Sequence, residues 1–251
     1  MPTREEAQAV ARRLHALSSE PRICRKAAAR DLAQRHPVDA NELIDQLLGL
    51  RREGWEAATC ALGAYAAALS LEAESIPHAE DLRRLANIQS LWTVEALFAD
   101  GPPVKELDPN AAARADAKLF SQSLGHLKTM ARATRDPDEL AKLAIFSNPV
   151  VVRNALMNPR LTEEGVIRIA ARRPARPEPL LEIWRSPRWS SRHSVRRALV
   201  FNPYFPPDIA AKIVPLLNRT DWEELAGDNA VHPTLRHQAR LLLGREPAVE
   251  E

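Results

Sequence analysis

Glycine and aromatic residues are scarce in this sequence, and their scarcity excludes several kinds of site and fold. Eight glycines in 251 residues form neither a Gly-x-Gly-x-x-Gly pattern nor a phosphate-binding loop of the Walker type. Aromatic residues make up 5% of the chain, and segments of alternating β-branched residues are hard to find. Because alanine and leucine fill most apolar positions instead, we predict an all-α protein.

Cysteine is nearly absent as well. The only two, Cys24 and Cys60, are too few for a disulfide framework or for a cysteine-ligated metal site. The seven histidines show no metal-binding spacing. Both cysteines lie in alanine-rich stretches, where cysteine usually serves as a small buried apolar side chain. We therefore expect neither a metal nor another cofactor.

Long apolar runs are also missing. The N-terminal residues lack the apolar run with a basic flank that is typical of a secretory signal. The best candidate for a membrane span, CALGAYAAALSL from Cys60, is too short to cross a bilayer. The location expected from these features is the cytoplasm.

Proline, by contrast, is abundant, and a repeated motif accounts for some of its placement. The stretch VRRALVFNPYFPPDIAAKIV begins at Val195, and VRNALMNPRLTEEGVIRIA begins at Val152. Both contain Val-Arg-x-Ala-Leu, then Asn-Pro, then a helix with periodic apolar residues. Such internal repetition is typical of proteins that stack short helical units into a solenoid.

Asparagine or aspartate before proline marks the expected boundaries between short helices. A residue before proline is disfavoured in the α conformation, so the preceding helix should end there, and proline suits the first position of the next helix. The marks are Asp136-Pro137, Asn148-Pro149, Asn158-Pro159 and Asn202-Pro203, with looser versions at Ser186-Pro187 and His232-Pro233. We predict that Pro159 and Pro203 lie at or near the first turn of a helix, with Asn158 and Asn202 at or beside the N-cap.

The pattern divides the chain into four regions. Apolar residues at three- and four-residue steps predict helices over residues 3–18, 23–36, 40–52, 55–73 and 78–99, joined as antiparallel hairpins. We expect N-terminal helices over 1–100, a break and a long connecting helix over 101–135, short repeats over 136–245 and a flexible tail over 246–251.

The connecting helix carries an apolar stripe with two interpretations. The stripe contains Ala113, Ala117, Phe120, Leu124, Leu127 and Ala131. Its spacing is compatible with a coiled coil, but it spans fewer heptads than a coiled coil needs, so we favour a helix that faces a core.

The repeat region resembles a known family. The stretches NPRLTEEGVIRIAARR and VRRALVFNPYFPPDIAAKIVPLL look like the variant leucine-rich repeats of bacteria, and DWEELAGDNAVHPTLRHQARLLL is similar to the ends of HEAT-like repeat proteins. The resemblance covers about residues 136–245, and the earlier helices are similar to HEAT helices in a more general way. It implies a right-handed α-solenoid of HEAT-like hairpins followed by short variant repeats. Some variant-repeat proteins hold an iron–sulfur cluster, but this chain lacks their clustered cysteines.

Charge is distributed unevenly along the chain. Residues 150–200 contain eleven arginines and four glutamates, with neither lysine nor aspartate, which gives a local net charge of +7 in a chain whose total is +2. We call one set of residues in this region the Arg–Trp band. It consists of Arg172, Arg173, Arg176, Trp184, Arg185, Arg188, Trp189, Arg192, Arg196 and Arg197.

Two interpretations of the Arg–Trp band remain open. It could be a solvated face with both tryptophans packed between repeats, as charge runs on helices usually are. Alternatively, it could bind a charged partner, since arginine pairs with carboxylates and phosphates and stacks on aromatic rings. In that case the arginines should project into solvent on one face, with Arg192 and Arg196 one helical turn apart. Trp184 or Trp189 should then lie partly exposed at the edge.

Two functions follow from the binding interpretation. The favoured one is a non-catalytic scaffold that binds another protein with an acidic surface. The alternative is nucleic-acid binding, in which arginines on a concave face of the solenoid contact phosphates. HEAT-like DNA glycosylases show that such a solenoid can even be an enzyme, although that is an analogy of fold only. The scaffold is favoured since dedicated nucleic-acid binders are usually basic throughout, whereas acidic regions flank this band.

Overall fold

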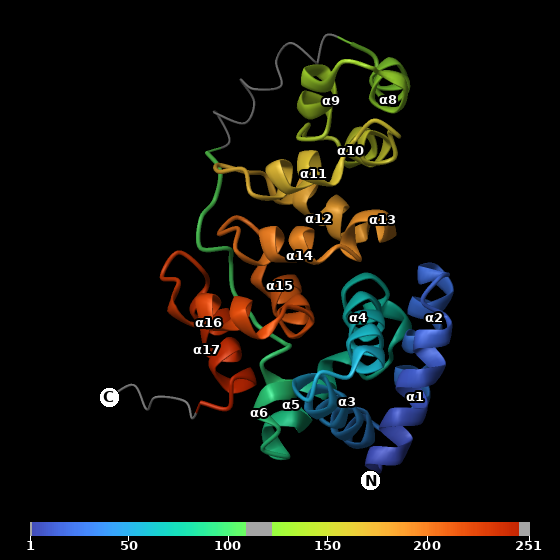
Figure 1. Cartoon of the computed structure of the whole chain (residues 1–251), viewed down its shortest axis with the longest axis vertical. Coiled ribbons are helices and arrows are strands. Elements are labelled where there is room, and N and C mark those ends of the chain that lie inside the picture. The colour runs from blue at the N-terminus through green and yellow to red at the C-terminus, as the bar shows by residue number, and fades with distance from the viewer. Residues whose placement is uncertain (1, 109–121, 246–251) are drawn as a thin grey trace. The chain divides into compact units, whose positions relative to one another are not determined.

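The computed structural model describes residues 2–108 and 122–245. In these residues it contains sixteen α-helices, two short 3₁₀ helices and no strand, which confirms the predicted all-α class. Two compact units divide the chain (Figure 1). The first unit comprises Met1–Gly101 and Pro207–Glu251, and the second comprises Pro102–Pro206.

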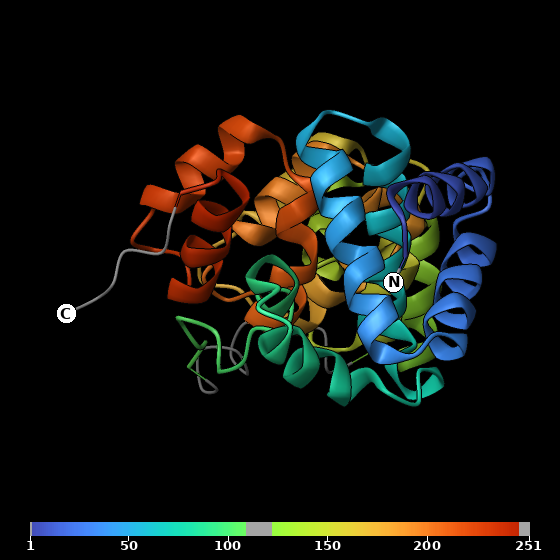
Figure 2. The same ribbon diagram turned by 90° about the horizontal axis from the view of Figure 1, so that it is seen from below.

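The first unit is built around one alanine-rich helix. Helix α4 packs against α1, α2, α3 and α15, and Figure 2 shows the blue helices of the N-terminal region side by side. The elements of the first unit are α1 (Arg4–Ala16), α2 (Pro21–Gln34), α3 (Pro37–Arg52), α4 (Glu56–Leu71), η1 (Ala73–Ser75), α5 (Ala79–Ile88), α6 (Trp92–Glu95), α15 (Pro207–Ile213), η2 (Val214–Leu216), α16 (Arg219–Gly227) and α17 (Pro233–Leu242). Small side chains on α4 let neighbouring helices approach closely, so this one helix can pack against several others.

The second unit consists of shorter helices that pack locally. They follow one another in chain order in Figure 1, and α10 contacts α8, α9 and α12. The helices are α8 (Leu124–Ala133), α9 (Pro137–Leu143), α10 (Pro149–Leu156), α11 (Glu163–Ala170), α12 (Pro177–Arg185), α13 (Pro187–Ser190) and α14 (His193–Val200).

The two units do not follow the boundaries expected from the sequence. Residues 207–245 group with the N-terminal helices, whereas the expected repeat region joined them to residues 136–206. The reason is that α15 packs on α4, and α16 and α17 pack on each other next to α15 and η2.

The long connecting helix is not continuous in the described residues. Helix α8 begins at Leu124, because the Ser123 hydroxyl accepts a hydrogen bond from the His126 amide (3.2 Å) and caps the helix there. Leu127 and Ala131 of the predicted stripe are buried, but Leu124 is exposed. Ala113, Ala117 and Phe120 lie outside the described residues.

The single helix predicted over residues 78–99 is also wrong. Helix α5 ends after Ile88 because Ser90 adopts a left-handed conformation, with φ of 58°. The Leu91 amide then donates to the Ala86 carbonyl, and the Ser90 amide donates to the Asn87 carbonyl (2.9 Å each). This is the hydrogen-bond pattern of a Schellman motif, in which glycine is the usual residue at the left-handed position.

Two of the Asn-Pro marks differ from the predicted geometry. Pro137 and Pro149 do begin helices, with Asp136 and Asn148 as N-caps. Pro159, however, lies in a turn before α11, whose N-cap is Thr162. Pro203 likewise lies in a turn before α15. Both prolines therefore precede the first turns of α11 and α15 instead of lying within them, and neither lies in the middle of a helix.

Asn158, which follows α10, and Asn202, which follows α14, instead bond from buried positions to the ends of earlier helices. The Asn202 side-chain amide donates to the carbonyls of Ala170 (2.7 Å) and Arg172 (3.1 Å), where α11 ends, and its oxygen accepts from the Tyr204 amide (3.0 Å). Asn158 repeats the arrangement at the end of α8. Since the last carbonyls of a helix have no partner within it, these amides satisfy groups that would otherwise be buried unpaired.

Substituting Asn202 should separate its role from that of an N-cap. We expect Asn202→Asp to lower the free energy of unfolding by about 2–3 kcal/mol at pH 7, because both donors are lost and a carboxylate faces two carbonyls. The same change at Asn148, Asn148→Asp, should alter it by less than about 0.5 kcal/mol, since aspartate caps helices equally well. Urea unfolding followed by circular dichroism measures both, and equal effects would contradict the assignment.

Ser90 provides a second test of local conformation. Ser90→Gly should raise the free energy of unfolding by about 0.5–1 kcal/mol, because glycine adopts a positive φ without the steric penalty of a side chain. The matched reverse change is Gly54→Ala at φ of 87°, which should lower it by about 1 kcal/mol. Thermal unfolding of both variants checks this, and a neutral or negative effect of Ser90→Gly would refute it.

A hydrogen-bonded carboxylate ties α1, α2 and α4 together. Asp31 accepts from the buried Tyr65 hydroxyl (2.7 Å), from Arg35 (2.8 Å) and from Arg13 (2.8 Å). Burial alone would raise the pKa of Asp31, but the hydrogen bonds from Arg35 and Tyr65 outweigh it and hold the pKa below its usual value.

This network predicts the pH dependence of stability. The pKa of Asp31 is lower in the folded chain than in the unfolded chain, where it is about 3.9. The Asp31 carboxylate therefore contributes its full stabilisation of the fold above the unfolded pKa. This stabilisation is lost as pH falls through the folded-state pKa. Asp31→Asn should therefore be less stable than the parent chain at pH 7. The difference should shrink steadily below about pH 4. Urea midpoints measured across this range provide the test, and a difference that does not change with pH would disprove the role of the charge.

Candidate functional site

The Arg–Trp band extends from the loop before α12 through α14, within the second unit. Both tryptophans are buried, with 3% of each residue exposed, so the expectation of a partly exposed tryptophan at the edge is wrong. The Trp189 indole donates to the Leu156 carbonyl at the end of α10 (2.9 Å), and the Arg188 guanidinium lies 4.3 Å from the ring centroid. Trp189 therefore holds α13 against α10.

Exposure varies among the arginines of the band. Arg172, Arg173, Arg185, Arg188 and Arg192 are exposed, whereas Arg176, Arg196 and Arg197 are half-buried. Arg192 immediately precedes α14 and lies 3.6 Å from Glu163. Arg196 instead donates to the Ser190 carbonyl (2.6 Å). The two therefore do not form the solvent-projecting pair that their spacing suggested.

Several band arginines bind backbone carbonyls of neighbouring helices. Arg173 donates to the Phe201 carbonyl after α14 (2.5 Å), and Arg188 donates to the carbonyls of Asn158 and Leu161 (3.2 Å each). Arg185 donates to the buried Glu182 carboxylate (2.8 Å), which also accepts a hydrogen bond from Arg153 (3.0 Å). Apart from the Arg185–Glu182 contact, which lies within α12, these contacts connect different helices or the loops that follow them, so part of the band stabilises the fold.

A groove on the second unit is lined by a different set of arginines. It lies between α9 and α11, has a volume of about 430 Å³, and is called here the α9–α11 groove. Its lining residues are Arg135, Pro137, Asp138, Leu140, Ala141, Ile145, Arg160, Leu161, Thr162, Gly165, Arg168, Ile169 and Arg172. Four arginines and one aspartate give this lining a net positive charge, above a floor that includes buried Leu140, Leu161 and Ile169.

Most of the groove's arginines are available to a ligand. Arg168 pairs with Glu164 on its own helix (3.1 Å), and both side chains are exposed. Within the described residues, Arg135, Arg160 and Arg172 form no side-chain hydrogen bond or ion pair. Exposed guanidinium groups without carboxylate partners are suited to bind carboxylates or phosphates from solution.

Only one residue of the groove's rim was predicted from the sequence. Arg172 belongs to the Arg–Trp band, whereas Arg135, Arg160 and Arg168 were missed. Arg135 and Arg160 each lie in a loop that leads into a helix of the groove, and Arg168 lies on α11 itself. No linear spacing marks this set, because packing of α9 near α11 is what brings it together.

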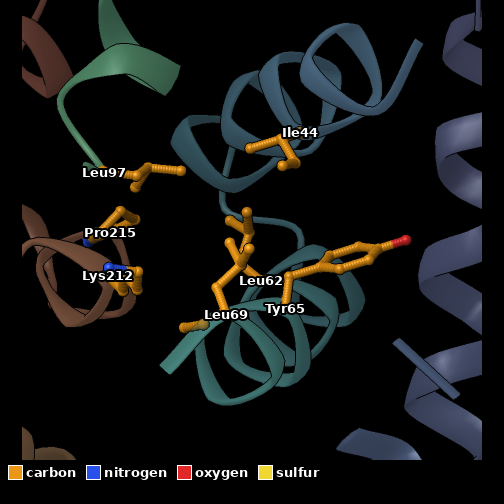
Figure 3. A pocket seen from close by; sticks show the side chains of 8 residues that line it. Ile44, Leu62, Tyr65, Leu69, Leu97, Lys212 and Pro215 are labelled. Carbon is orange, nitrogen blue, oxygen red and sulfur yellow. The ribbon is translucent and has the colours of Figure 1, made fainter. Parts of the chain in front are cut away.

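The first unit contains a small internal cavity and a separate surface groove. The cavity measures about 10 Å³ and is lined by apolar side chains together with the stem of Lys212 (Figure 3). The Tyr65 hydroxyl points away from the cavity in this view. A space of this size has room for about one water molecule, so it is no substrate site. The surface groove, about 410 Å³, lies between α6 and α17 beside the half-exposed Trp92.

Lys212 at this cavity is a half-buried cation with structural partners. Burial lowers the pKa of its ammonium. The ammonium donates to the Asp208 carbonyl one turn earlier on α15 (2.6 Å) and lies 5.7 Å from the Phe98 ring centroid. These contacts account for its position without a ligand.

The part of the chain that the structure describes offers neither a metal-binding cluster nor a membrane span. In residues 2–108 and 122–245, no three His, Cys, Asp or Glu side chains form a group that could hold a metal ion. None of the helices described has both the length and the apolar character to cross a bilayer.

Comparison of the chain with protein-family models, with curated proteins and with solved structures yields no match. The α9–α11 groove is therefore the basis for assigning a function, because it combines volume, an apolar floor and unpaired positive charge.

Proposed function

We propose that this chain is a non-catalytic protein-binding module whose α9–α11 groove receives an acidic segment of a partner protein. The observation that carries the proposal is the placement of Arg135, Arg160, Arg168 and Arg172 around the apolar floor of one groove. Such a site is suited to bind a ligand whose carboxylates pair with the arginines of the rim and whose apolar side chains pack on the floor.

The apolar floor favours a protein partner over a nucleic acid. Nucleic-acid interfaces are more polar and more positively charged than protein interfaces, and most of their contacts reach phosphates. A phosphate backbone would pair with the rim but would leave Leu140, Leu161 and Ile169 without a matching surface. Nucleic-acid binding is retained as the second candidate because the rim alone would suit phosphates.

The local packing supports a repeat architecture for the second unit. We propose that its helices form a short solenoid of the HEAT and variant leucine-rich kind. Asn158 and Asn202 occupy equivalent places in the two Val-Arg-x-Ala-Leu copies, and each donates to the end of an earlier helix. A binding groove between neighbouring units is the usual place of recognition in such stacks.

Charge reversal at the rim tests the proposed function. The probe is a helical peptide with leucines on one face and glutamates beside them, and its counterpart carries lysine in place of glutamate. We expect the acidic peptide to bind and the basic one not to bind. Arg160→Glu with Arg172→Glu should weaken binding at least tenfold, since two attractions become repulsions, together about 1.4 kcal/mol or more. Fluorescence anisotropy measures the dissociation constants.

Two comparisons make this test specific. Arg22→Glu with Arg30→Glu makes the same charge change at exposed positions on α2 and should leave peptide binding unchanged. Titrations with random single-stranded and duplex DNA at two salt concentrations test the second candidate, whose affinity should fall steeply with salt. Failure of the acidic peptide to bind, or equal weakening by both double variants, would disprove the proposal. If DNA binds and the rim variants weaken that binding, nucleic-acid binding becomes the supported function instead.

A further inference from the structure

The two cysteines of this chain lie next to each other although they are far apart in the sequence. Cys24 is on α2 and Cys60 is on α4, and these helices pack together. The two thiols are in hydrogen-bond contact, and Cys24 also donates to the Leu14 carbonyl (3.3 Å). A chain with two cysteines in all thus brings them together.

Small residues make this close approach possible. Ala28 and Ala29 on α2 and Ala61 and Ala64 on α4 are buried. Helices that meet through alanine can approach more closely than helices separated by leucine, because less side-chain volume lies between the backbones. A disulfide requires such an approach, since its Cα atoms lie about 4.4–6.8 Å apart.

The two thiols differ in their exposure to solvent. Cys24 is buried, and its hydrogen bond to Cys60 together with burial raises the pKa of its thiol well above the usual value. Cys60 is partly exposed. Because the thiolate is the nucleophile in exchange reactions and must be reached by the oxidant, Cys60 is the residue that reacts first.

We propose that Cys24 and Cys60 form a reversible disulfide site, oxidised by a low-molecular-weight disulfide such as oxidised glutathione. The Cys60 thiolate attacks one sulfur of the oxidant, forming a mixed disulfide and releasing one glutathione thiolate. Cys24 then loses its proton to this thiolate or to water, and its sulfur attacks the Cys60 sulfur. The second glutathione leaves, so two protein thiols and one oxidant disulfide become one protein disulfide and two glutathione thiols. This site belongs to the first unit and is independent of the groove.

Mass spectrometry of the full chain after equilibration with excess oxidised glutathione tests the proposal. We expect the mass to fall by two hydrogen atoms with no glutathione attached, and a non-reducing digest to contain a linked peptide pair with Cys24 and Cys60. Reactive thiols should fall from two per chain to none and return after dithiothreitol. The smaller oxidant diamide, which takes up two electrons and two protons, should give the same product.

Single variants provide the matched controls. Cys24→Ala should accumulate one glutathione on Cys60, because no second thiol is present to displace it. Cys60→Ala should stay reduced for longer than the parent chain, because Cys24 is buried. The proposal is wrong if the parent chain keeps glutathione on Cys60 with Cys24 still reduced. It is also wrong if the oxidised product is a dimer linked between chains, or if neither oxidant removes the thiols of the folded protein.

Discussion

The second unit depends on donors for the carbonyl groups at the ends of short helices. A helix leaves its last four carbonyls without partners inside it, and α10, α11 and α14 have only eight residues each. About half of the carbonyls in such a helix therefore need another donor. Side chains from neighbouring helices supply many of them: Asn158 to α8, Asn202 to α11, Trp189 to α10 and Arg173 to the residue after α14. The first unit uses the same device, with Gln238 donating to Ala211 and Trp222 to Val214.

This demand accounts for some of the arginines between residues 150 and 200. Arginine carries five donors on a long side chain, so it can reach a carbonyl on the next helix while part of its guanidinium stays hydrated. Arg173 and Arg188 do so. The same residue type therefore serves two purposes in one unit. Arg173 and Arg188 of the band donate to carbonyls at or after helix ends, whereas the arginines around the α9–α11 groove, including Arg172 of the band, remain exposed to solvent.

Helix class and most helix boundaries in the first unit could be predicted from periodicity and capping residues. Thr3, for example, accepts a hydrogen bond from the Glu6 amide and caps α1, and threonine is a common N-cap residue. The prolines were harder, because Asn148-Pro149 and Asn158-Pro159 look alike in the sequence but differ in structure. Asn148 caps its own helix, whereas Asn158 is buried against the end of an earlier one. When a residue is buried by a segment far away in the chain, the sequence around that residue gives no sign of it. The groove could not be predicted for the same reason, since three of its four arginines, Arg135, Arg160 and Arg168, do not belong to the Arg–Trp band. Trp184 and Trp189 look like binding residues when only their arginine neighbours are considered, but their large apolar rings are better buried between helices.

The discontinuous first unit has a consequence for the order in which a ribosome delivers the chain. The part of α4 that packs against α15 leaves the exit tunnel well before residues 207–213 are made. The whole second unit, Pro102–Pro206, is synthesised in between. Its contacts are local, so it can close while translation continues. The apolar surface of α4 meanwhile stays uncovered and must avoid other nascent chains until the last part of the sequence arrives. Slow codons or a chaperone would matter most in that interval, after the second unit has formed and before α15 is available.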